Sequence, residues 1–126
     1  MLPMNTEMTF GEFIIAKRKE QNLPARQLAI AINISPVYMC DIEKSRKFAL
    51  SDELLDKIRT VLQLSENEAD RMYDLAAIAR STVSADLPKY IMENQVVRTA
   101  LRTAKKNQIP DEKWERFIKE IIKKEE

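Results

Sequence analysis

The sequence predicts an all-α protein, and three of its features support that prediction. Its 126 residues include a single Gly and no run in which apolar and polar residues alternate, so β-strands are not expected. Apolar residues instead recur three and four positions apart along most of the chain, as they do on one face of an α-helix. Ser, Thr or Pro precedes most of these stretches, which is typical of helix N-termini.

The first helix is expected to begin after Thr9 and to end near Gln21. Thr9 and Glu12 have the spacing of a capping box, in which each side chain accepts a hydrogen bond from the other residue's backbone N–H. Residues 1–8 show no periodicity, so we expect them to form a flexible tail. The inward face of this helix should hold Phe10, Phe13 and Ile14.

Two short helices joined by a tight turn are predicted between residues 23 and 46. Pro24 suits the first position of the first helix, where a missing N–H is tolerated. Asn33 tolerates a left-handed backbone, which a turn requires. Ser35 is a suitable N-cap for a second helix that begins at Pro36. The residues expected to face inward are Leu28, Ala29, Ile32, Met39 and Ile42.

This helix pair resembles the helix-turn-helix of phage-repressor-like transcriptional regulators of the Cro/cI or XRE type. The resemblance covers residues 9–64 and rests on Leu28-Ala29, on Ile34-Ser35 and on the run from Ile42 to Arg46. The chain departs from the usual pattern at Pro24-Ala25, which replaces Thr-Gln, and at Asn33 and Ser45, which replace Gly. The resemblance implies a lambda-repressor-like bundle of five helices, which we place at residues 9–79. The apolar pattern of the remaining residues predicts a helical extension over residues 80–126.

The resemblance also implies how the protein would contact double-stranded DNA. The second helix, residues 36–44, would enter the major groove as the recognition helix. Val37 can contact a thymine methyl group, and Asp41 can accept a hydrogen bond from a cytosine amino group. The residues at base-reading positions are Pro36, Val37, Cys40 and Asp41. The residues expected at phosphates are Arg26, Tyr38, Lys44, Arg46 and Lys47.

Several of these residues also have a purely structural interpretation. Tyr38 would fit equally well if it were buried beside Met39, and Cys40 is expected to be a half-buried filler rather than a redox sensor. Cations after the second helix complement the helix dipole whether or not they bind phosphate. For Arg18, the resemblance implies a structural ion pair with Glu43.

Two further helices complete the expected bundle. Ser51 is placed to cap the fourth helix, and Ser65 and Glu68 have the spacing of a second capping box that opens the fifth, which ends near Ala79. The apolar stripe of the fourth helix comprises Leu54, Leu55, Ile58, Val61 and Leu62. The packing face of the fifth comprises Met72, Leu75, Ala76 and Ala79.

The polar segment 80–85 is expected to separate the bundle from the extension, which has three helical stretches: 87–94, 96–104 and one that opens at Pro110. The apolar residues of the last stretch share one face, which we expect to seat a dimer. The alternative is packing within the chain, onto Val97 and Leu101. These apolar residues are Trp114, Phe117, Ile118, Ile121 and Ile122.

Composition excludes several classes of function. The chain has one Cys, so we expect neither an internal disulfide nor a zinc site with several Cys ligands. It has no His, which is the commonest metal ligand and general base. We therefore expect no metal-dependent activity, no enzymatic function and no cofactor. No apolar run is long enough to span a bilayer, and no signal-peptide pattern is present, which favours the cytoplasm. Residues 1–50 hold seven Lys or Arg against five Asp or Glu, whereas residues 51–79 hold three against seven. A DNA-facing surface is therefore expected in the first segment.

The sequence thus favours a sequence-specific DNA-binding transcriptional regulator, such as a repressor, that acts as a homodimer on a two-fold site. The competing hypothesis is a protein-interaction module, or an antitoxin-like protein that binds a protein partner through the same fold. The net charge of +1 and the modest readout chemistry favour that alternative.

Overall fold

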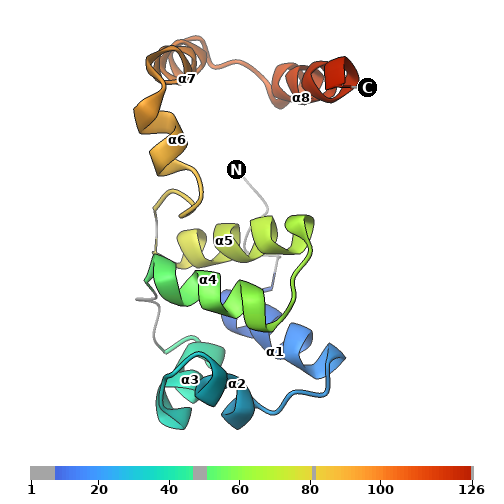
Figure 1. Ribbon diagram of the computed structural model, residues 1–126. Helices are drawn as coiled ribbons and strands as arrows, with labels where there is room; N and C mark the ends of the chain where they lie inside the picture. Colours follow the sequence, from blue (N-terminus) through green and yellow to red (C-terminus); the bar gives the residue numbers. More distant parts are fainter. Residues whose placement is uncertain (1–7, 47–50, 81, 126) are drawn as a thin grey trace. The chain divides into compact units, whose positions relative to one another are not determined.

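The computed structural model describes residues 8–46, 51–80 and 82–125, and these residues form eight helices and no β-strand (Figure 1). The all-α prediction is confirmed. Residues 1–7 of the expected tail lie outside the described residues. No helix in the described part of the chain is long and apolar enough to cross a membrane. The helices are α1 (Phe10–Glu20), α2 (Ala25–Ala31), α3 (Pro36–Glu43), α4 (Asp52–Val61), α5 (Glu66–Arg80), α6 (Pro88–Glu93), α7 (Gln95–Asn107) and α8 (Asp111–Glu125).

The chain divides into two compact units, residues 1–88 and residues 89–126. From the sequence, we expect the boundary after Ala79. In the structure, Ser84 is buried and its hydroxyl donates to the Asp74 carboxylate of α5, while Ala85 packs against the core. The first unit therefore extends to Pro88, because the segment after α5 folds back onto that helix.

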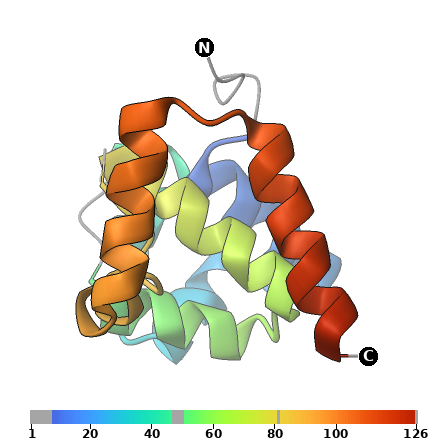
Figure 2. The same ribbon diagram turned by 90° about the horizontal axis from the view of Figure 1, so that it is seen from above.

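The first unit contains the hydrophobic core. Helix α3 packs against α1 and α2, and α1 packs against α5, so that α1 lies between the helix pair and the rest of the unit (Figures 1 and 2). The inward faces predicted for α1, α2 and α3 are confirmed, and in α4 Leu55, Ile58 and Leu62 are fully buried. The largest fully buried side chains are Phe13, Ile14, Leu28, Ile32, Met39, Ile42, Leu55, Ile58, Leu62 and Met72.

The prediction for α5 was wrong at its last turn. Ala79 is exposed, whereas Ala69, Tyr73 and Ala77 are buried in addition to the predicted residues. The buried stripe begins one turn earlier than the apolar pattern indicates, because Tyr73 and two small Ala residues contribute to it. Alanine fits a close helix contact but gives little hydropathy signal.

Side chains cap the helices as the sequence predicts. The Thr9 N–H donates to Glu12 Oε1 at 2.8 Å, and the Glu12 N–H donates to Thr9 Oγ1 at 3.1 Å. Ser65 and Glu68 form the same reciprocal box at 2.9 and 3.1 Å. Helix α2 differs by one residue, because Pro24 has an extended backbone and serves as its N-cap. These caps satisfy N–H groups that a helix cannot pair internally.

Within residues 8–46, 51–80 and 82–125, five residues other than Gly adopt a left-handed backbone, each at the end of a helix. They are Asn22, Asn33, Ser45, Gln63 and Gln108, with φ between 48° and 62°. The only Gly in the chain is used elsewhere. A Cβ on Gly11 would lie 2.4 Å from the Glu43 carbonyl oxygen, so Gly11 permits the close approach of α1 to the end of α3.

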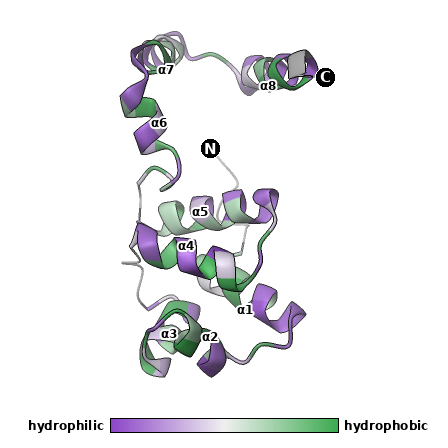
Figure 3. Cartoon of the chain, in the orientation of Figure 1, coloured by the Kyte–Doolittle hydropathy of each residue, from purple (hydrophilic) through white to green (hydrophobic). Residues whose placement is uncertain are grey.

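The second unit begins at Lys89 within α6 and contains α7 and α8, and none of its described side chains is buried. Figures 1 and 2 show α7 and α8 apart along their lengths, joined by residues 108–110. Apolar and polar residues lie side by side on both helices (Figure 3). Arg98 links α7 to α6, because its Nη1 donates to the Ile91 carbonyl at 3.1 Å. Within α8, the rings of Trp114 and Phe117 meet edge to face at 6.1 Å.

Candidate nucleic-acid interface

Local hydrogen bonds fix the turn between α2 and α3. Asn33 has φ 62°, and its N–H donates to the Ile30 carbonyl at 3.1 Å. The N–H of Ile34 donates to the Ala29 carbonyl at 2.9 Å, which completes a Schellman motif. Ser35 Oγ then accepts from the Tyr38 N–H at 3.0 Å and caps α3. The turn between these two predicted helices is therefore built from short-range contacts.

An ion pair fixes the other end of α3 to α1. Arg18 Nε donates to Glu43 Oε2 at 2.7 Å, and Arg18 Nη2 donates to Glu43 Oε1 at 2.9 Å. Only 14% of the Arg18 side chain and 8% of the Glu43 side chain are exposed. The hydrogen bonds to Glu43 raise the pKa of Arg18 above its ordinary value. This two-point contact is the pair that the resemblance implies, and it limits rotation of α3 against the core.

The outer face of α3 presents the residues expected to read bases. Val37 is 72% exposed, Pro36 is exposed, and Cys40 and Asp41 are half-buried. Val37 and Asp41 are four residues apart, so they lie on one face of the helix. Tyr38 is half-buried against the core, which favours its structural interpretation. The structure thus brings an apolar and an acidic group together on an accessible surface.

Two of the cations expected at phosphates, Lys44 and Arg46, follow the end of α3. Lys44 is exposed at the C-cap, and Arg26 is exposed on α2. Ser45, at φ 61°, turns the chain back, so that the Arg46 N–H donates to the Asp41 carbonyl at 2.7 Å. The Arg46 guanidinium lies 3.7 Å from the Asp41 carboxylate. Asp41, which is expected to contact a base, thereby pairs with Arg46, which is expected to contact a phosphate. Lys47 lies outside the described residues.

Two exposed residues of α2, the helix that packs against α3, were not predicted from the sequence as site residues. Gln27 is exposed, and Ile30 is 62% exposed. They are three residues apart, on the face opposite to buried Leu28 and Ile32. An isoleucine on the polar side of a predicted amphipathic helix is the signal that would have identified Ile30.

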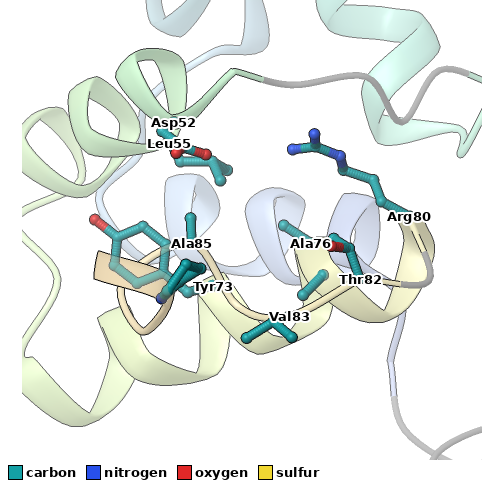
Figure 4. A pocket seen from close by; sticks show the side chains of 10 residues that line it. Asp52, Leu55, Tyr73, Ala76, Arg80, Thr82, Val83 and Ala85 are labelled. Atoms are coloured by element: carbon teal, nitrogen blue, oxygen red, sulfur yellow. The ribbon is translucent and has the colours of Figure 1, made fainter. Parts of the chain in front are cut away.

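A separate pocket of about 200 Å³ lies between α4, α5 and the segment after α5. Figure 4 shows Asp52 and Leu55 on one side of it and Arg80, Thr82 and Val83 on the other. The Tyr73 hydroxyl donates to the Asp56 carboxylate, and burial together with this bond raises the pKa of Tyr73. The pocket lies where residues 82–88 pack beside α4 and α5. Among the described residues, no cluster of three or more Cys, Asp or Glu side chains is arranged to bind a metal ion.

Comparison with known proteins finds no family model, no curated protein and no solved structure that matches the chain.

Proposed function

We propose that the protein is a sequence-specific DNA-binding transcriptional regulator with a lambda-repressor-like fold. The observation that carries this proposal is the exposed outer face of α3, whose two ends are held in place by the Schellman turn and by Arg18–Glu43. A helix with its side chains is about 10–12 Å wide, and the major groove of B-DNA is about 12 Å wide. Helix α3 is therefore a recognition helix presented in a fixed orientation.

The exposed side chains have suitable chemistry for this role. Val37 supplies an apolar contact for a thymine methyl group, and Asp41 accepts a hydrogen bond from a cytosine amino group. Lys44 and Arg26 supply charge for the phosphate backbone, which contributes a large share of DNA-binding free energy. Arg46 has a second role, because it neutralises the Asp41 carboxylate that would otherwise repel the phosphates.

The proposed regulator acts as a homodimer that binds a two-fold site. Two-fold pairing is the commonest symmetry of soluble oligomers, and a palindromic DNA site mirrors it. The apolar face of α8 supports this assignment because Phe117, Ile118, Ile121 and Ile122 are all exposed in the single chain. Such side chains contribute about 1.5–3 kcal/mol each when they are buried.

A protein-interaction module is the second candidate, and one observation favours it. Ile30 and Val37 are large apolar side chains that lie exposed on the neighbouring helices α2 and α3. Exposed apolar groups on adjacent helices suit a protein partner as well as they suit DNA. The near-neutral net charge is also compatible with a protein partner, including a toxin-like one.

Binding to a randomised duplex library at several salt concentrations separates the two candidates. For a DNA-binding regulator, we expect sequence-dependent binding that weakens steeply with salt. Lys44→Ala should weaken binding to all sequences and reduce the salt slope by about one unit. Val37→Ala should instead change the preferred base, with about 1–3 kcal/mol of discrimination at stake.

Lys57→Ala is the matched control, because Lys57 is an exposed cation on α4, away from the proposed surface. It should leave the salt slope unchanged. Equal effects of Lys44→Ala and Lys57→Ala would contradict the proposed orientation of α3. The absence of sequence-dependent binding even at low salt would favour the protein-interaction module.

A further inference from the structure

The apolar faces of α7 and α8 are uncovered in the single chain. Leu101, Phe117, Ile118, Ile121 and Ile122 are between 41% and 55% exposed, although the helices are strongly amphipathic. The two helices contain 13 and 15 residues. Isolated helices of about this length are marginally stable in water, and most helical stability comes from packing of the apolar face. The second unit therefore needs a partner surface.

The last turn of α7 and the first turn of α8 carry opposite charges, although α8 as a whole holds five acidic and five basic residues. Every charged residue of α7 is basic, and Lys105 and Lys106 lie in its last turn. Helix α8 begins with Asp111 and Glu112 in its first turn, and Glu115 follows. An antiparallel α7–α8 contact places the basic end of α7 beside the acidic start of α8. The same contact joins their apolar stripes, Val97, Ala100, Leu101 and Ala104 on α7 with Trp114, Phe117, Ile118 and Ile121 on α8.

The two helices of one chain do not make this contact. Their link is Gln108, Ile109 and Pro110, with Gln108 in the left-handed region at φ 48°. Figures 1 and 2 both show the helices apart on either side of this link. The matching faces of α7 and α8 are thus both available to a second copy of the chain.

We propose that two copies of this protein exchange these helices, so that α7 of each chain packs antiparallel on α8 of the other. A two-fold axis relates the two contacts, so that each chain contributes α7 to one of them and α8 to the other. This inference deepens the dimer that is part of the proposed function by adding α7 to its interface. The test of this inference does not depend on DNA binding, because self-association is measured without DNA.

Complementation between two full-length variants tests the exchange by sedimentation equilibrium. Leu101→Asp damages the α7 face, and Ile118→Asp damages the α8 face. Each variant alone has both contacts broken, so we expect the mass of one chain and a dimer dissociation constant raised at least a hundredfold. An equimolar mixture retains one intact contact, between α7 of the Ile118→Asp chain and α8 of the Leu101→Asp chain. The mixture should therefore recover the mass of two chains.

Thr99→Asp and Arg116→Asp are matched controls, because both residues are exposed on the opposite faces of the same helices. They should sediment as the unmodified dimer. Leu101→Ala and Ile118→Ala should repeat the pattern with smaller shifts if an aspartate unfolds a helix. A monomeric unmodified chain, dimerisation by Leu101→Asp alone, or a mixture without recovery would overturn the exchange. Dimerisation by Leu101→Asp alone would instead indicate pairing of α8 with α8.

Discussion

Arg18 and Glu43 illustrate how one pair of residues sets the position of a whole helix. They lie on α1 and at the end of α3, and both side chains are nearly buried. Gly11 meets the same end of α3, because only a residue without Cβ tolerates its carbonyl oxygens at that distance. Two independent contacts thus anchor the C-terminal end of the proposed recognition helix.

Replacing one member of this pair should destabilise the first unit by about 3 kcal/mol. Arg18→Ala leaves the Glu43 carboxylate buried without its partner, and Glu43→Ala does the same to Arg18. The double variant Arg18→Met, Glu43→Leu should lose clearly less, because no uncompensated charge remains. Urea unfolding measures the change. Lys19→Ala is the control, since Lys19 is exposed on the same helix, and an equal loss for this control would argue against the pair.

Lys17 belongs to a second ion pair that the sequence does not predict. Its Nζ lies 2.7 Å from the Glu68 carboxylate of α5, 51 residues away. The hydrogen bond from Lys17 lowers the pKa of Glu68 to about 2, and the Ser65 N–H adds to this effect. Hydrogen bonding to Glu68 also raises the pKa of Lys17. The run of basic residues 17–19 on α1 thus includes a cation, Lys17, that forms an ion pair with α5.

The Lys17–Glu68 pair should make the free energy of unfolding fall within a defined range of acidic pH. The pKa of Glu68 is lower in the folded chain than the ordinary 4.5, so its stabilising effect is complete above that pH. It should be lost as the pH falls from about 4.5 toward 2. Denaturant unfolding from pH 7 to 2.5 should show unmodified protein and Glu68→Gln converging in acid. Glu66→Gln, in the same helix turn, should show a smaller difference at pH 7. A gap between unmodified protein and Glu68→Gln that stays constant with pH would contradict this interpretation.

At the scale of helices, the ends are built without glycine. Asn22, Asn33, Ser45 and Gln63 each take the left-handed position of a Schellman motif, where Gly is usual. A left-handed residue with a Cβ costs about 1–2 kcal/mol relative to its right-handed form. The turns at Asn33 and Gln63 directly follow buried Ile32 and Leu62, so the core holds these two in place.

Gln63→Gly should therefore stabilise the first unit by about 0.5–1 kcal/mol. The gain is the relief of left-handed strain, reduced by the greater freedom of Gly in the unfolded chain. Gln63 is exposed and distant from α3, so stability is the property that should change. Thermal unfolding measures it. Gln63→Ala keeps the Cβ and should bring no gain, and equal gains for Ala and Gly would rule out backbone strain as the cause.

At the scale of the molecule, we expect the core to be stable without the second unit. All buried apolar residues of the described chain lie in the first unit, which ends at Pro88. A chain that ends at Pro88 should unfold cooperatively at the same temperature as the full chain at low concentration, where a dimer is dissociated. Ending the chain at Arg80 should lower stability by about 1–2 kcal/mol, because Ser84 no longer donates to Asp74 and Ala85 no longer covers the core. Calorimetry on the two truncated chains decides this, and identical stabilities would show that residues 82–88 contribute nothing.

The sequence by itself determined the helices and their ends. Capping boxes, left-handed Asn33 and apolar spacing depend on residues within four or five positions of each other, so they can be recognised without the fold. The family resemblance added the Arg18–Glu43 pair.

Only the tertiary structure decided which distant residues meet. Lys17 pairs with Glu68 and Tyr73 pairs with Asp56, because packing of the helices determines which side chains come within reach. It also decided that α7 and α8 stay apart within one chain. An amphipathic pattern specifies that a helix must bury one face, but the three-dimensional path of the chain determines what that face can reach.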